Sequence, residues 1–181
     1  MHTKKLTALS LLCALALVLG FFESYLPVFS VVPGGKIGLA NIVTMVVFCL
    51  FSLPEAIGFG LFRSLLTSVL FSGFSAFFYS AAGSLFSVLS MWIAHKMLRE
   101  RVSVIGLSII GAASFHVGQL TVASFILGSI QIFRYFPVLG ILSAFAGLIT
   151  GVISHMLLRY TDRKKLQNYD KTENGENSLW K

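Results

Sequence analysis

A single arginine stands inside a long apolar stretch of this chain. Arg63 lies in the segment Pro54 to Gly73, PEAIGFGLFRSLLTSVLFSG, with apolar residues on both sides. A guanidinium in a membrane-spanning helix costs roughly 2.5–3.5 kcal/mol on insertion scales, so such a residue is expected to face a polar interior or a partner. The residue therefore indicates a membrane protein whose helices enclose something polar.

Further polar side chains stand alone in the other apolar segments, namely Glu23, Asn41, Tyr79, His116 and Gln119. A helix rises about 1.5 Å per residue, which gives each of them an approximate depth, and all five fall in the outer half of the layer. His116 and Gln119 are three residues apart and so share one helical face. A common cavity in the outer half would satisfy these groups in lipid, and we interpret it as a substrate-binding site.

Arg63 falls at a different depth from these residues. It lies roughly 12 Å above the inner boundary, whereas Glu23 lies about 25 Å up its own span and Asn41 about 6 Å below the outer boundary. A direct ion pair between Arg63 and Glu23 would need a strongly tilted helix. We therefore expect a second polar partner, or water, to serve Arg63.

The loop of residues 27–38 is interpreted as a gate over this cavity. Lys36 sits at its lip, and Pro33, Gly34 and Gly35 permit an unusual turn. Simpler interpretations stay open for every residue of the site. Tyr79 and Glu23 could be interfacial, Asn41, His116 and Gln119 could bond neighbouring helices, Arg63 could be a structural pin, and the loop could be only a connection.

The elements that would position these residues are apolar helices. The chain has 181 residues, of which 56% are hydrophobic and 12% charged, too apolar for a soluble domain of this size. A spanning helix needs about 20 apolar residues. We predict an all-α membrane domain over residues 1–158 and a polar tail over 159–181. The six predicted spans cover about 6–26, 37–53, 56–72, 74–95, 104–128 and 136–158.

We interpret the formal net charge of +7 as a consequence of membrane topology and not as a sign of nucleic-acid binding. Short loops on the cytoplasmic side collect Lys and Arg. With the N-terminus inside, only Lys36 and Arg134 fall in outer loops, and the inner set is Lys4, Lys5, Lys96, Arg99, Arg101, Arg159, Arg163, Lys164 and Lys165. This predicts a multi-pass cell-membrane protein with both termini in the cytoplasm. Leu6–Phe22 is interpreted as the first span, not a cleaved signal, because bulky residues follow it.

Small and acidic residues add two local predictions. Gly and Ser recur within the spans, which favours close helix packing or, alternatively, a docking face for another membrane subunit. Glu55 follows Pro54 at a predicted helix start, where an acidic side chain suits the first turn.

The motifs of a self-sufficient enzyme are missing from the sequence. It contains no DDxxD pair for a diphosphate–magnesium site, no P-loop, no haem motif and no plausible catalytic triad. Cys13 and Cys49 lie in apolar runs without paired spacing, so neither a disulfide nor a metal site is predicted. We expect a chain without its own cofactor or catalytic residues.

One stretch carries a family resemblance. Residues 33–42, PGGKIGLANI, resemble the PGxKLGLANI signature of a bacterial membrane family known both as heptaprenyl diphosphate synthase component I and as Gx transporter. Shorter matches follow in the family's order at 61–66, 78–84 and 117–120, and the resemblance covers about residues 6–158. The chain departs from an HNxGQ-like pattern, because His116 stands in the place of its Asn.

That family is similar to the substrate-binding S components of energy-coupling-factor transporters. The resemblance implies six helices, an outward-facing site under the first loop, and partnership with a transmembrane coupling subunit and two ATPases. The synthase name implies instead an accessory subunit beside a soluble prenyl synthase. Relatives beside flavin-linked extracellular electron-transfer proteins imply a third role, linked to flavin or quinone.

The leading interpretation of the sequence is transport of a small polar or amphipathic molecule from outside. The site would be lined by Glu23, Asn41, Tyr79, His116 and Gln119, with charge from Lys36 and Arg63. Movement of the loop would gate the site, and ATP hydrolysis by the partners would drive release inward.

Overall fold

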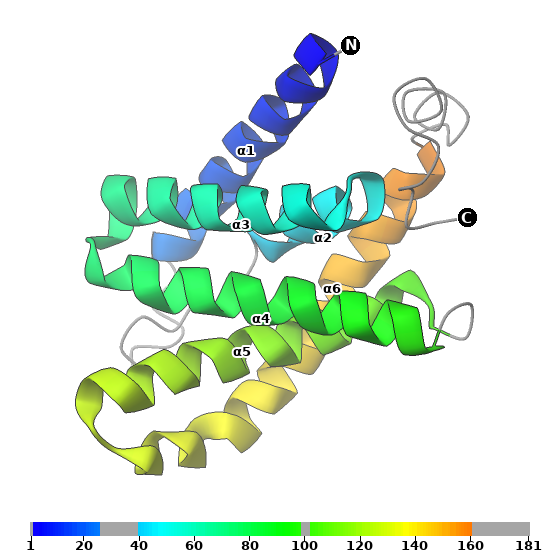
Figure 1. The fold of residues 1–181 in the computed structure, drawn as a ribbon. Coiled ribbons are helices and arrows are strands. Elements are labelled where there is room, and N and C mark those ends of the chain that lie inside the picture. Colours follow the sequence, from blue (N-terminus) through cyan, green and yellow to red (C-terminus); the bar gives the residue numbers. More distant parts are fainter. Residues whose placement is uncertain (1, 26–39, 99–101, 161–181) are drawn as a thin grey trace.

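The described structure consists of five long helices and one short one (Figure 1). The computed structural model describes residues 2–25, 40–98 and 102–160. The helices are α1 (His2–Tyr25), α2 (Asn41–Leu50), α3 (Leu53–Thr67), α4 (Ser75–Leu98), α5 (Val104–Leu127) and α6 (Phe136–Tyr160). A π-helical turn, η2 (Ser68–Ser72), continues α3, and a 3-10 helix, η4 (Ile130–Tyr135), precedes α6. No strand occurs among these residues, as the all-α prediction expects.

Five helical segments are long and apolar enough to cross a membrane. They are Lys5–Phe22, Leu53–Ser72, Ser75–Leu98, Val104–Leu127 and Ile130–Leu157. The predicted span at 37–53 differs, because its described helix has only ten residues, Asn41–Leu50. Such a helix extends about 15 Å, half of a hydrocarbon layer of about 30 Å.

The short helix is the most enclosed part of the fold. Every residue of α2 from Ile42 to Cys49 is buried, and α2 packs against α1, α3, α4 and α6. A helix that is apolar all round suits either lipid or a protein interior. Here the surrounding helices cover it, so α2 reaches the middle of the bundle without needing the length of a full span.

The other helices form a hairpin series (Figure 1). Helices α3, α4 and α5 lie side by side, and α6 crosses behind them at an angle. The α2–α3 turn and the ends of α4 and α6 lie at one end of the bundle, and the α3–α4 and α5–α6 turns lie at the other. At the α3–α4 turn Gly73 has φ +79°, which only glycine adopts readily.

The start of α3 is fixed by Glu55. The backbone N–H of Ser52 donates to Glu55 Oε2 at 2.9 Å, so Glu55 closes the first turn of the helix and the sequence prediction for this residue is confirmed. The same carboxylate bonds Lys5 Nζ through Oε1 at 2.7 Å. The ion pair holds the beginning of α1 at the end of the bundle where α3 begins.

Glycines let the last three helices approach closely. A Cβ on Gly118 would lie 2.7 Å from the carbonyl oxygen of Ala82, and one on Gly147 would lie 2.7 Å from the Cα of Ile109. Backbone atoms at this distance leave no room for a side chain. These small residues therefore serve internal packing of α4 on α5 and of α5 on α6.

Candidate functional site

Arg63 lies inside the bundle, on the face of α3 that turns away from lipid. Its side chain is 5% exposed. Nη2 donates hydrogen bonds to Ser84 Oγ at 3.0 Å and, at a longer 3.4 Å, to Asn41 Oδ1. Asn41 and Ser84 come from α2 and α4, so three helices meet at the guanidinium. They are polar partners of the kind expected for this charge in lipid.

A hydroxyl group extends the polar surroundings of this arginine. Ser64 Oγ donates to the Gly60 carbonyl oxygen at 2.8 Å and lies 3.4 Å from Ser84 Oγ. A Cβ on Gly60 would lie 3.2 Å from the Cβ of Ser84, so α3 and α4 are close enough for these short side chains to meet. We call Asn41, Gly60, Arg63, Ser64 and Ser84 the Arg63 cluster.

Arg63 and Asn41 lie at one level of the bundle, and not at the two different depths that the sequence predicted. Arg63 is ten residues into α3, which places it about 15 Å from the start of that helix. Asn41 opens α2 and stands about 14 Å from its end at Leu50. Because a two-residue turn joins the two helices, both residues share one depth. The sequence prediction had separated the two residues in depth by assuming a span from residue 37, whereas the described helix is Asn41–Leu50.

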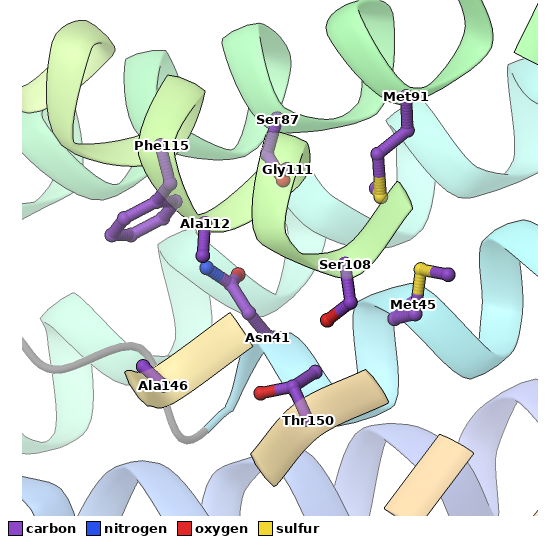
Figure 2. Close-up of a pocket in the computed structure, with 10 residues that line it drawn as sticks. All are labelled: Asn41, Met45, Ser87, Met91, Ser108, Gly111, Ala112, Phe115, Ala146 and Thr150. Atoms are coloured by element: carbon purple, nitrogen blue, oxygen red, sulfur yellow. The ribbon is translucent and has the colours of Figure 1, made fainter. Parts of the chain in front are cut away.

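A small cavity lies beside the Arg63 cluster (Figure 2). Its volume is about 10 Å³, whereas sites for small organic ligands measure about 300–1,000 Å³. Figure 2 shows the Asn41 amide reaching into it between α5 and α6. The lining residues are Asn41 and Met45 of α2, Ser87 and Met91 of α4, Ser108, Gly111, Ala112 and Phe115 of α5, and Ala146 and Thr150 of α6.

His116 and Gln119 form a second polar group on α5. Both are buried, and His116 Nδ1 lies 3.1 Å from Gln119 Oε1, so the two residues share one helical face as predicted. A carbonyl oxygen only accepts, so this contact is a hydrogen bond in the tautomer that carries its hydrogen on Nδ1. Tyr79 of α4 is also buried, at 7% exposure, rather than spread over the bundle surface.

The structure does not describe the side chains of the remaining predicted site residues. Glu23 belongs to α1, but its side chain lies outside the described residues. Lys36 and the gate residues Pro33, Gly34 and Gly35 also lie outside them. The gate and the full seven-residue site therefore stay predictions, of which the structure brings together Arg63 with Asn41 and His116 with Gln119.

Sequence reasoning missed the hydroxyl residues of the site. Ser84 Oγ accepts a hydrogen bond from Arg63 at 3.0 Å, and Ser108 and Thr150 line the cavity. Serine is common in membrane helices, so none of them stands out alone. A usable signal is the spacing of Ser80, Ser84 and Ser87, which puts three hydroxyl groups on one face of α4.

Metal binding has no basis among residues 2–25, 40–98 and 102–160. Within those ranges no three His, Cys, Asp or Glu residues are grouped so that they could hold an ion. The chemistry available at the Arg63 cluster is hydrogen bonding and a fixed positive charge.

Comparison with known families gives a match over most of the chain. The family model described as heptaprenyl diphosphate synthase component I matches residues 12–157. The match runs from α1 to α6 and includes the Arg63 cluster, the cavity and the His116–Gln119 pair. No curated protein and no solved structure matches the chain.

Proposed function

The chain belongs to the heptaprenyl diphosphate synthase component I family, and on that premise we propose that it is the membrane-embedded accessory subunit of a prenyl diphosphate synthase. The family match over residues 12–157 carries this proposal. The family's description as component I implies a second subunit of the synthase. The long apolar helices are compatible with a place in the bilayer.

We assign bond formation to the partner subunit. Metal ions that bind a diphosphate are held by carboxylates, and the two aspartates of this chain, Asp162 and Asp170, stand apart in the polar tail. A soluble synthase with aspartate-rich motifs would supply that site. The present chain would supply attachment to the membrane.

Attachment suits the product of such an enzyme. A heptaprenyl chain is a long hydrocarbon, and each buried CH₂ contributes about 0.8 kcal/mol to its transfer into lipid. A synthase held against the bilayer releases its growing product directly into that solvent. The membrane subunit thereby favours long products, because the chain has an apolar phase to enter.

The partner would dock at the end of the bundle that carries Lys5 and Lys96. We propose six spans within residues 1–158, with both termini and this end in the cytoplasm, following the excess of Lys and Arg predicted there. Lys96 is exposed at the end of α4. Arg134, which is also exposed, lies in η4 at the opposite end and serves as a matched control.

Co-purification tests this proposal. The tagged chain is co-expressed with the aspartate-rich prenyl synthase of the same genome, extracted in mild detergent and analysed for bound synthase and for product chain length. We expect co-elution and longer products with the chain present. Lys96→Glu should weaken co-elution, whereas Arg134→Glu should not. Separate elution together with an unchanged product length would rule the accessory role out.

Transport is a second candidate, favoured by one observation. Arg63, Asn41 and Ser84 come from three helices and meet beside a cavity, as a substrate-binding membrane subunit of an energy-coupling-factor-like transporter would require. Glu23, Lys36, Tyr79, His116 and Gln119 would complete the site, and the loop 27–38 would gate it. The cavity of about 10 Å³ would have to widen to admit a ligand.

The partner distinguishes the two candidates. A transport subunit should co-purify with a transmembrane coupling protein and two ATPases instead of a synthase. Replacing both Asn41 and Gln119 by Ala should then abolish uptake while leaving the ATPases bound. Unchanged uptake in that double variant would remove these residues from the site. The electron-transfer role stays a prediction, to be tested by flavin or quinone absorbance of the purified protein.

A further inference from the structure

One hydroxyl group in the cavity wall differs from its neighbours. Ser108 of α5 is 3% exposed, and within the described part of the chain its Oγ has no hydrogen-bond partner. Buried serines in helices commonly bond the carbonyl four residues earlier. Ser64 and Ser143 do so here, at 2.8 and 2.6 Å. Ser108 instead turns its oxygen toward the cavity, facing Asn41 and Thr150 (Figure 2).

The cavity has the size and the walls that suit one water molecule. Its volume of about 10 Å³ is at the scale of a single water, for which roughly 10–15 Å³ is needed. A buried water needs two to four polar partners. Asn41 provides one, because its Oδ1 accepts from Arg63 and its NH₂ group is left to donate. Ser108 provides the second.

A cation in this cavity is disfavoured by the neighbouring charge. The Arg63 guanidinium bonds Asn41, which is itself a lining residue, and like charges in a low dielectric repel strongly. An apolar ligand is disfavoured as well, since it would leave Ser108 Oγ buried without a partner. A small neutral molecule that can both donate and accept a hydrogen bond is not repelled by this charge and gives Ser108 Oγ a partner.

We propose that this cavity binds one ordered water molecule, which bridges the amide of Asn41 and the hydroxyl of Ser108. The bridge ties Asn41 of the Arg63 cluster to Ser108 of α5. It also fixes the orientation of the Asn41 amide, because the amide nitrogen faces the water while Oδ1 faces Arg63. The site is independent of whether the chain serves a synthase or a transporter.

Radiolytic labelling tests for the water directly. X-ray pulses convert bound water into hydroxyl radicals, which oxidise the side chains beside it, methionine among the fastest. Met45 and Met91 line the cavity and are each 2% exposed, so bulk solvent does not reach them. We expect both to be oxidised in the intact protein in detergent. Met97, 78% exposed at the end of α4, is the internal positive control.

Variants locate the water at Ser108. Ser108→Val removes the hydroxyl and fills the cavity, so oxidation of Met45 and Met91 should fall at least threefold while that of Met97 is unchanged. Ser114→Val, on the same helix but outside the cavity lining, should leave all three at wild-type rates. If Ser108→Val does not fold, the proposal is tested by the oxidation of Met45 and Met91 in the wild type and in Ser108→Ala. If Met45 and Met91 are oxidised only at background level while Met97 is oxidised, the cavity is dry and the proposal is wrong. The proposal is also wrong if Met45 and Met91 are oxidised equally in the wild type and in the Ser108 variants.

Discussion

Arg63 and Ser84 are joined across the contact of α3 with α4 by a hydrogen bond of 3.0 Å, from Nη2 to Oγ. Ser84 has room for this role because Gly60 stands opposite, where a Cβ would lie 3.2 Å from that of Ser84. A guanidinium is costly in hydrocarbon, and here it is turned inward and given acceptors from two other helices. The charge is therefore part of the packing of the bundle.

Removing the serine hydroxyl should destabilise the protein through Arg63. Ser84→Ala deletes one acceptor of a buried charged group, which costs about 1–3 kcal/mol. Unfolding by SDS titration in mixed micelles measures this loss. In Arg63→Met the same serine change should cost much less, so a double-mutant cycle should give a coupling of about 1–3 kcal/mol. Additive effects of the two changes would mean that the bond contributes nothing.

A methyl group on Gly118 should disrupt the contact of α4 with α5. Its Cβ would lie 2.7 Å from the Ala82 carbonyl oxygen, and overpacking of this kind costs about 1–3 kcal/mol. Gly140→Ala is the matched control, since nothing lies within 4 Å of its Cβ, and it should be neutral or stabilising by up to about 1 kcal/mol. Thermal unfolding in detergent would compare the two; equal midpoints would contradict the close packing.

The ion pair of Lys5 with Glu55 should contribute little to global stability. The two side chains are 34% and 27% exposed, and partly exposed pairs contribute about 0–1 kcal/mol. Lys5→Met should therefore lower the unfolding free energy by less than about 1 kcal/mol, with a smaller effect in high salt. Hydrogen exchange should nevertheless become faster in the first turns of α1. A loss above about 2 kcal/mol would assign this pair a larger role than surface pairs have.

Replacing His116 by asparagine should destabilise the protein less than replacing it by alanine. Asn carries a donor and an acceptor and stands at this position in the pattern of the resembled family, whereas Ala would leave buried Gln119 without its 3.1 Å contact to His116. We expect His116→Asn to be more stable than His116→Ala by about 1–2 kcal/mol. Midpoints of thermal unfolding test the order, and the reverse order would show that an Asn amide makes no stabilising hydrogen bond at this position.

The architecture followed from the sequence for the five long apolar helices. Long runs without charge predict spans because hydrocarbon admits little else, and five of the predicted spans have described helices of spanning length. The segment NIVTMVVFCL of α2 looks equally apolar. Hydrophobicity does not distinguish a helix covered by lipid from one covered by protein, so its shorter length could not be predicted.

The candidate site was predictable at its unusual residues and not at its ordinary ones. Arg63 stands out because charge is rare in a span, and His116 with Gln119 because three residues bring them onto one face. The predicted difference in depth between Arg63 and Asn41 was wrong, because the two side chains are hydrogen-bonded to each other. Ser84 did not stand out alone, since its role comes from which helix lies opposite, and this is a tertiary property.

The sparse packing of α1 bears on how the protein is made. Its outward residues Leu6, Leu11 and Phe22 are 60% or more exposed, whereas Ala16 is fully buried in the bundle. Lys5 meets a carboxylate that emerges from the ribosome fifty residues later. Until α3 has been synthesised, the first helix must rest in the bilayer on its own apolar length. We therefore expect insertion and assembly to be separate events for this segment.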